Sequence, residues 1–460
     1  MKICGWWLRT SARLRPRGIS FRSGLAAGFG IFLLVVGGVP PSAPGQQMSR
    51  VDRDLAKAML GNVCSDVQGN YLDAKLNGLN WEALVHEAKA NIDKAPTMGA
   101  AVAQIEGLLE HLNDSHTFFV SPRRINTVDY GWKFEVIGKR ALVTEVTPNS
   151  DAEKKGMRPG DELLTIDGFT VDRASALKLK RAIYVLVPLS RLDVDLRDPA
   201  GKLLHLNLAG NIIGHPAVFG LGGSSLSSNE QRNEAEHLRN MARAKYRELG
   251  PELMILRIPA FFQIGWDVDR LFKKARAHKT LIVDLRGTPG GRLDSVNDYL
   301  AHVLIQDAKV GDSVGRDRTK PITIKRNRRS GFMGDLIVLV DSETASAAEI
   351  FARTVQLEER GTILGDHTAG YTLEARYFIH RYGVNPVYSY GASVTVAHPI
   401  MADGKSLEHV GVEPDRTFLP TDADLAAGRD PLLTYAAGLA GVKLSPEDAA
   451  KIFPRTSMAE

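Results

Sequence analysis

The chain has 460 residues, of which 44% are hydrophobic and 24% charged, so it is long enough for two or three domains and too apolar for a disordered chain. Its formal charge is +5, but six basic residues and no acidic residue lie within residues 1–47. The remainder holds 52 basic and 53 acidic residues, a formal charge of −1. This balance gives no reason to expect a nucleic acid partner.

Residues 1–47 have the layout of an export signal. A basic stretch ends at Arg22, an apolar run follows from Leu25 to Val39, and prolines and small residues come next. The run is about 15 residues long, short of the ~20 that a membrane-spanning helix needs. Two alternatives stay open: cleavage near Ala43, which we prefer, and a retained anchor in the inner membrane. Both predict a periplasmic or otherwise extracytoplasmic protein, with no other contact to the membrane.

Cysteines and short motifs give no sign of a disulfide, a metal or a cofactor. Only Cys64 lies outside residues 1–47, in an apolar periodic stretch, so we expect a buried structural thiol. The sequence has no HExxH pair, no cysteine cluster and no phosphate-binding glycine loop. We therefore expect no metal and no organic cofactor.

The first part of the chain, residues 50–125, is predicted to be helical. Apolar residues recur at helical spacing after residue 50, and two further helices are expected at Trp81–Ile92 and Met98–Leu112. Asn80 and Thr97 are the expected N-caps of these two helices.

Residues 126–210 change to the alternation of β-strands. Short strands are expected at residues 134–137, 141–146, 192–196 and 203–208, with a short helix at 150–156 and a turn, strand and turn at 157–168. Residues 211–235 are rich in glycine and serine and are predicted to be a linker or loop. A charged helix is expected from about Glu230 to Leu249.

Residues 236–425 alternate apolar runs with helical patterns. The expected strands are residues 253–258, 280–285, 336–340 and 362–364, and the expected helices are 266–277, 293–305 and 345–357. Alternation of this kind predicts an α/β layer with a largely parallel sheet. Residues 426–460 are expected to form a helical tail.

Three segments resemble one family when they are taken together. Residues 156–168, within 126–210, resemble the most distinctive stretch of a PDZ domain. Residues 284–291 (DLRGTPGG) and 342–350 (SETASAAEI) resemble the core signatures of the tail-specific, C-terminal processing serine peptidases. The resemblance covers roughly residues 50–420 in the family's order. It implies a multidomain α/β protein with an N-terminal helical region, a PDZ-like β domain and a peptidase core of the ClpP/crotonase-like type.

Ser346 is the candidate nucleophile. It follows the apolar strand 336–340 and opens a helix in which its neighbours are small alanines. A hydroxyl at such a junction lies near helix N-terminal amides, which stabilise a nearby anion. From spacing alone, a simple N-cap serine is an equal alternative, and the family resemblance favours catalysis.

The family's commoner branch takes its base from a lysine, and this chain does not have it. The corresponding segment is residues 365–372, with Tyr371 where the lysine would stand. A phenol with a pKa near ~10 is a poor general base. A Ser-Lys dyad is therefore not expected.

The other branch, similar to the tricorn protease core, uses histidine. Residues 113–117 resemble its Ser-His segment, which implies His116 as general base and acid and Ser115 as a second serine beside it. Glu408 matches the branch's acidic member, which orients the histidine. The alternatives are a surface histidine and a solvated turn acid. The rival bases are His367, which is the main one, His398 and His409.

Glycines and aromatic residues complete the predicted site. The backbone N–H groups of Gly290, Gly291 and Ala347 are the expected oxyanion hole, and a simple strand-ending turn is the alternative for the two glycines. In the PDZ-like module, the segment in the place of the carboxylate-binding loop is expected to hold the C-terminus of a substrate. The residues expected to bind this C-terminus are Tyr130, Gly131, Trp132 and Phe134. Alternatively, the module only gates the active site or acts as a spacer.

The sequence thus predicts an exported serine endopeptidase that acts on proteins or peptides through an acyl-enzyme on Ser346. The competing hypothesis is a catalytically inactive peptide- or ligand-binding protein on the same scaffold, since a fold does not fix an activity. A PDZ adaptor is a third possibility, but it would leave the segment around Ser346 unexplained.

Overall fold

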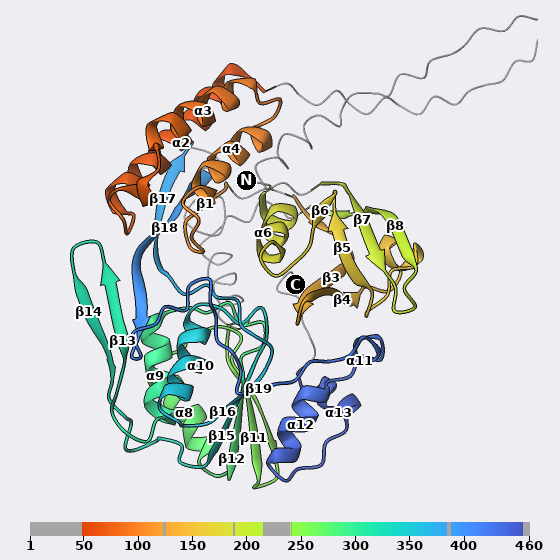
Figure 1. The fold of residues 1–460 in the computed structure, drawn as a ribbon, viewed down its shortest axis with the longest axis vertical. Coiled ribbons are helices and arrows are strands. Elements are labelled where there is room, and N and C mark those ends of the chain that lie inside the picture. Colours follow the sequence, from red (N-terminus) through yellow and green to blue (C-terminus); the bar gives the residue numbers. More distant parts are fainter. Residues whose placement is uncertain are drawn as a thin grey trace, which may run out of the picture.

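A computed structural model of the chain describes residues 48–122, 126–186, 189–214, 240, 242–383 and 388–453. Figure 1 shows a helical unit, a β-rich module beside it and a larger α/β core. No helix among the described ranges is long and apolar enough to cross a membrane. The predicted export segment, residues 1–47, lies outside the described residues.

The N-terminal unit is helical as far as Glu110, as predicted, whereas Phe118–Val120, within the range 50–125 that was predicted to be helical, forms a strand. Its elements are α2 (Arg50–Asn70), η1 (Leu76–Gly78), α3 (Trp81–Lys94) and α4 (Met98–Glu110). The side chain of Asn80 accepts a hydrogen bond from the Ala83 N–H and that of Thr97 from the Ala100 N–H, so both predicted N-caps are confirmed. Cys64 is buried and free, as expected, and its burial raises the pKa of the thiol to about 12.

The β-rich module has the strand order β3-β4-β5-β7-β8, with β6 paired to β5. Its elements are β3 (Trp132–Ile137), β4 (Arg140–Val146), α5 (Asp151–Lys154), β5 (Glu162–Ile166), β6 (Phe169–Thr170), α6 (Ala176–Arg181), η2 (Ala182–Leu186), β7 (Arg191–Arg197) and β8 (Leu203–Ala209). Buried residues alternate along β3 and β7, which is the pattern of strands with one face on a core. In this order β3 ends the sheet and α6 packs into the same core as β3.

The α/β core is built on a six-stranded sheet, β10-β11-β12-β15-β16-β19. The strands are β10 (Lys245–Leu249), β11 (Leu253–Arg257), β12 (Thr280–Asp284), β15 (Asp335–Val340), β16 (Thr362–Gly365) and β19 (Arg416–Thr417). All neighbours pair in parallel except β10 with β11, which confirms the largely parallel sheet.

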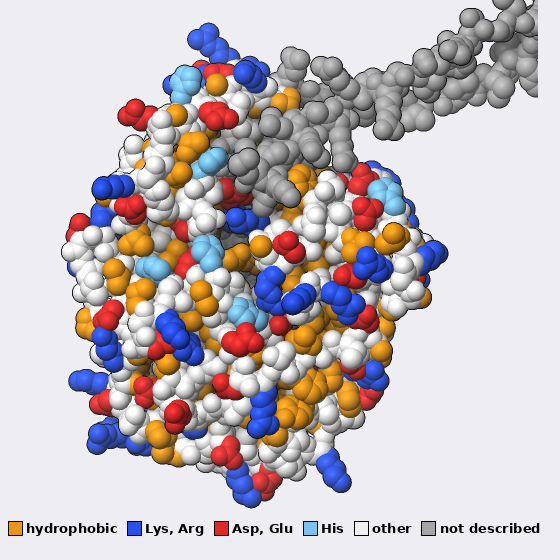
Figure 2. Space-filling model, in the orientation of Figure 1, with side chains coloured by type: hydrophobic (Ala, Val, Ile, Leu, Met, Phe, Trp, Pro, Cys, Tyr) orange, Lys and Arg blue, Asp and Glu red, His pale blue; other side chains and the backbone are white. Residues whose placement is uncertain are grey.

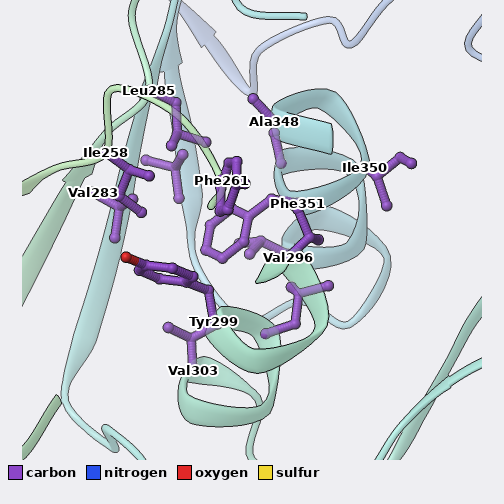
Figure 3. Close-up of a cluster of buried hydrophobic side chains, with 14 of the residues drawn as sticks. Ile258, Phe261, Val283, Leu285, Val296, Tyr299, Val303, Ala348, Ile350 and Phe351 are labelled. Carbon is purple, nitrogen blue, oxygen red and sulfur yellow. The ribbon is translucent and has the colours of Figure 1, made fainter. Parts of the chain in front are cut away.

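Helices cover both faces of this sheet. One face carries α8 (Trp266–Ala275), α9 (Leu293–Val303) and α10 (Ala347–Leu357), and the other carries α12 (Pro431–Leu439) and α13 (Pro446–Ile452) after α11 (Asp422–Ala426). Because both faces are covered, the central strands β11, β12 and β15 are apolar along most of their length rather than alternating. Figure 3 shows the contact that fixes α10, in which Phe351 and Ala348 point toward Phe261.

A second sheet joins the helical unit to the core. It consists of β1 (Phe118–Val120), β13 (Ala308–Gly315), β14 (Thr319–Ile324), β17 (Glu374–Tyr382) and β18 (Tyr388–Met401), with β2 (Asn126–Asp129) and β9 (Asn211–Gly214) pairing separately. The long strand β18 pairs with β1 near its start and with β13 near its end. It therefore connects the segment after α4 directly to the core.

Two sequence predictions need correction. The helix expected from about Glu230 to Leu249 is wrong at its C-terminal end, because Lys245–Leu249 forms β10, and its first part, residues 230–239, lies outside the described residues. This strand lies at the edge of the sheet, where charged side chains reach solvent and mask the strand pattern. The linker expected at 211–235 begins with strand β9 instead, and residues 215–235 lie outside the described residues. Figure 2 shows acidic and basic side chains interspersed on one face, in keeping with the near-zero charge after residue 47.

Candidate active site

Ser346 lies at the turn between β15 and α10, and its backbone is strained. Its φ of 55° and ψ of −123° fall in a region that residues other than glycine rarely adopt. The preceding turn is fixed by Thr344, whose hydroxyl donates to the Leu285 carbonyl oxygen at 2.9 Å, and by the Ala345 N–H, which donates to the Thr288 carbonyl at 2.9 Å. The strained turn at Ser346 is thus held against the glycine-rich loop that follows β12.

Gly290 lies close to Ser346, whereas Gly291 lies against the backbone of Phe261. A Cβ on Gly290 would lie 2.6 Å from the Ser346 Cβ and 3.0 Å from the Ala347 nitrogen. A Cβ on Gly291 would lie 2.3 Å from the Phe261 carbonyl oxygen. Both glycines have positive φ, 102° and 145°. The chain needs glycine at both positions because no side chain fits between this loop, the Ser346 turn and the Phe261 segment.

His116, Ser115 and Glu408 form a continuous hydrogen-bonded chain. The Nδ1 of His116 lies 2.6 Å from the Ser115 Oγ, and this hydroxyl donates to the Glu408 Oε2 at 3.0 Å. The Ser115 N–H also donates to the Glu408 Oε1 at 3.0 Å. Because the hydroxyl has one proton and gives it to the carboxylate, the His116 Nδ1 must carry its own proton and donate it. The Nε2 of His116 is then left as the acceptor nitrogen.

Electrostatics favour a neutral His116 near neutral pH. Burial lowers the pKa of the imidazole below its usual value, while the carboxylates of Glu408 and Asp114 act in the opposite direction. The Glu408 carboxylate is 8% exposed and also accepts a hydrogen bond from the Thr372 N–H at 2.9 Å. An imidazole of this kind, oriented by a buried carboxylate, is suited to general base catalysis.

Asp114 was not predicted, and it fixes the backbone that carries His116. One of its oxygens, Oδ1, accepts from the His116 N–H at 2.8 Å, the Thr117 N–H at 2.6 Å and the Thr395 hydroxyl at 3.0 Å. Thr395 belongs to β18, so this turn is anchored to the second sheet. An aspartate two residues before a histidine is the sequence signal of such a turn.

The rival bases make other contacts. The Nδ1 of His367 lies 3.0 Å from the Thr368 carbonyl oxygen, and the Nε2 of His398 lies 2.6 Å from the Ser406 hydroxyl. His409 places its Nε2 3.1 Å from the Asn113 carbonyl oxygen and 3.6 Å from Glu408. Tyr371, in the place of the branch lysine, has its pKa raised by burial and then by Glu408 and Glu349, so it is a neutral phenol near pH 7.

Glu349 is a further residue that the sequence analysis left without a role. It lies three residues after Ser346, is 0% exposed, and its Oε2 accepts from the Ser346 N–H at 3.0 Å and the Tyr371 N–H at 2.9 Å. The Ser-x-x-Glu spacing at the start of a helix is the signal that could have found it.

Of the four residues predicted to bind a peptide in the β-rich module, three have buried side chains and the fourth is a glycine. The side chains of Tyr130, Trp132 and Phe134 are buried in the module's core. The Gly131 N–H donates to the Asp129 Oδ1 at 2.8 Å. Lys180 of α6 lies over the Phe134 ring, with its Nζ 4.6 Å from the ring centroid, and forms an ion pair with Glu343 of the core.

Comparisons with known proteins agree with this reading of the core. Residues 252–418 match the model of Peptidase family S41. The chain is 24% identical to the carboxyl-terminal-processing protease of Synechocystis over 76% of this chain and 78% of that protein. It is 25% identical to the tail-specific protease of Haemophilus influenzae over 72% of this chain and 49% of that protein.

The fold resembles solved structures as well. A crystal structure of mature CPAF aligns with a TM-score of 0.59 at 14% identity and covers 82% of this chain and 94% of that one. A likeness at this identity concerns the mixed α/β multidomain fold alone. The chain is thus a serine-type peptidase, a hydrolase: its residues 252–418 match the family S41 peptidase model, and it is similar to the carboxyl-terminal-processing proteases.

Proposed function

We propose that the protein is an endopeptidase that cleaves peptide bonds through an acyl-enzyme on Ser346, with His116 as general base and acid. The observation that carries this proposal is the chain of hydrogen bonds from the His116 Nδ1 through Ser115 to Glu408, which leaves the Nε2 to accept a proton. Sequence reasoning proposed the same members from motifs far apart in the chain.

The reaction follows from these roles. The His116 Nε2 takes the hydroxyl proton as the Ser346 Oγ bonds to the scissile carbonyl carbon, and the N–H groups of Gly290, Gly291 and Ala347 receive the oxyanion. The imidazolium then gives its proton to the leaving amine as the C–N bond breaks. Water, deprotonated by the same nitrogen, then attacks the acyl carbon. The bond to the Ser346 Oγ breaks as this oxygen takes the proton back from the imidazolium, and the acid is released.

Hydrolysis of fluorescein-labelled casein tests this assignment. We expect Ser346→Ala to lower the rate by about a thousandfold or more, because no other group replaces the nucleophile. The control is Ser313→Ala, a half-buried serine on β13, which should keep the wild-type rate. Turnover by Ser346→Ala at the wild-type rate would contradict the assignment.

Substrate C-termini are the proposed recognition element, through the pocket that Val136 of β3 lines together with Ala176 and Leu177 of α6. Support comes from the order of the sheet, in which β3 lies at an edge where a peptide can add as a strand. Peptides with a free C-terminal carboxylate should be cut faster than the same peptides with a C-terminal amide. Equal rates would rule out carboxylate recognition.

Export from the cytoplasm is proposed from residues 1–47 alone, either with cleavage near Ala43 or as an inner-membrane anchor. Fractionation of a bacterium that expresses the chain should find the protein in the periplasmic or inner-membrane fraction. Recovery of the whole chain from the cytoplasm would contradict export.

A further inference from the structure

Glu349 is a fully buried carboxylate beside the nucleophile, and all its described partners are hydrogen-bond donors. Its Oε1 accepts from the Thr368 hydroxyl at 2.6 Å and the Gly370 N–H at 2.7 Å, and its Oε2 accepts from the N–H groups of Ser346 and Tyr371. A glutamate that only caps a helix is solvated and needs just one of these contacts, the one from the N-cap N–H, which is that of Ser346. The other three come from a segment about twenty residues further along the chain.

The donors of Glu349 belong to the two halves of the active site. Ser346 is the nucleophile, whereas the N–H of Thr372, directly after Tyr371, holds the Glu408 Oε2 at 2.9 Å. Two adjacent backbone amides therefore bind the two buried carboxylates. The Tyr371 N–H binds Glu349, which contacts the nucleophile turn, and the Thr372 N–H binds Glu408, which contacts the histidine chain.

Thr368 extends this connection to the turn that contains Glu408. Its hydroxyl donates to Glu349 and accepts from the Val412 N–H at 2.6 Å. Its own N–H donates to the Val412 carbonyl oxygen at 3.2 Å. The Glu349 carboxylate thus contacts, directly or through one hydroxyl, each segment that sets the separation of Ser346 and Glu408.

We propose that Glu349 is a positioning residue whose ionised carboxylate sets the geometry between Ser346 and the Glu408-supported histidine. The inference rests on the proposed function of Ser346 and His116. Its chemical basis is that three of the four partners are backbone N–H groups, which only donate. A protonated carboxyl would turn one of its acceptor positions into a donor that faces these N–H groups. The set of four hydrogen bonds to Glu349, called the clamp below, would then weaken.

The pKa of Glu349 sets where this weakening occurs. Burial raises the pKa from its ordinary value of 4.5 to about 7, although the hydrogen bonds from Thr368, Tyr371, Gly370 and Ser346 act to lower it. The groups that face the carboxyl are these donors, the Tyr371 phenol and, beyond the Thr372 amide, Glu408. The ionised form dominates above about pH 7, so the clamp is intact there and is lost as the pH falls.

The experiment measures the rate constant for labelling of Ser346 by a fluorophosphonate between pH 5 and 9. For the wild-type protein we expect the rate to fall below pH 7 with a midpoint near the pKa of Glu349. Glu349→Gln should label about tenfold or more slowly at pH 8, and its acid midpoint should move below 6.5, where His116 titrates.

Thr368→Val provides an independent variant with the opposite sign. It removes a donor to the ionised carboxylate, so it should raise the pKa of Glu349 and move the acid midpoint of labelling to higher pH. Asp161→Asn, a change to a carboxylate that is 2% exposed in the β-rich module, is the matched control and should leave the profile unchanged.

The outcomes separate the two proposals. An unchanged acid midpoint in both Glu349→Gln and Thr368→Val, whatever the rate, would overturn the role of Glu349. If Glu349→Gln does not fold, the acid midpoint of labelling in Thr368→Val decides: a move to higher pH supports the role of Glu349, and an unchanged midpoint overturns it. Wild-type protein that is not labelled at Ser346 at any pH would instead overturn the proposed function.

Discussion

At the scale of single residues, the site depends on short turns that place reactive groups rather than on the reactive groups alone. Asp114 illustrates this point, because its Oδ1 binds two backbone N–H groups of the histidine turn and a hydroxyl from β18. Hydrogen bonds to a charged acceptor are worth about 1.5–3 kcal/mol each. The position of the His116 ring is therefore set by a neighbour that takes no part in proton transfer.

Asp114→Ala should reduce peptidase activity by about 10- to 100-fold, because the turn that orients the His116 ring loses the acceptor of three hydrogen bonds. Asp114→Asn keeps an oxygen acceptor of the same shape and should stay within about threefold of the wild type. Steady-state hydrolysis of a peptide substrate compares the two variants. Equal losses in both would mean that the negative charge, and not the turn, is what matters.

Residue identities in the site could be predicted from motifs, but their mutual arrangement could not. Ser346, His116 and Glu408 each stand in a recognisable local pattern. Ser115 and Glu408 are 293 positions apart, and only the folded chain brings them to 3.0 Å. Glu349 and Asp114 each stand in a short local pattern, but their contacts with residues 368–371 and with Thr395 come from distant parts of the chain, and these contacts cannot be read from the sequence.

At the scale of elements, the glycine-rich loop after β12 and the turn before α10 fit together as a pair. A Cβ at Gly290 would meet the Ser346 Cβ at 2.6 Å and the Ala345 carbonyl oxygen at 2.9 Å. Distances under 3.0 Å require the backbone to shift. The loop thus tolerates no side chain at Gly290, one of the predicted oxyanion donors.

Gly290→Ala should therefore lower activity by about a hundredfold while the protein stays folded, since one misplaced oxyanion donor costs this much. Gly201→Ala is the control. Gly201 has a similar positive φ of 89°, but a Cβ added there would meet no atom within 4 Å. An alanine at this position therefore has the backbone strain without the clash. Rates and thermal melting curves of both variants check the prediction. An active Gly290→Ala protein would contradict it.

Elements with strong local patterns were predicted well, and those made by distant pairing were not. The helices of the N-terminal unit and the buried strands of the core follow from spacing. The second sheet was missed because β18 pairs with β1 and β13, from distant parts of the chain, and because β17 and β13 mix charged and apolar residues.

At the scale of the whole molecule, the β-rich module is attached to the core by a small set of polar contacts. Arg173 donates to the His367 carbonyl oxygen at 2.7 Å, to the Gly138 carbonyl oxygen at 2.9 Å and to Asp366 at 2.7 Å. The Gly138 N–H donates to the same Asp366 Oδ2 at 2.8 Å. Further ion pairs join Arg140 to Asp422 and Lys180 to Glu343.

Arg173→Ala should loosen this attachment, because it removes three hydrogen bonds, two of them to the core. Amide hydrogen exchange at Gly138 is expected to become about tenfold faster. Arg191→Ala, an exposed arginine within the same module, is the control and should leave this amide unchanged. Unaltered exchange at Gly138 in Arg173→Ala would show that the remaining contacts hold the module alone.

Labelling of the protein by a fluorophosphonate, mapped by mass spectrometry, tests the central claim most directly. The account predicts that wild-type protein is labelled at Ser346 and that His116→Ala slows the labelling by about a hundredfold or more, since the hydroxyl loses its base. His205→Ala, whose side chain is 69% exposed in the β-rich module, should label at the wild-type rate. Labelling of His116→Ala at the wild-type rate would contradict the account.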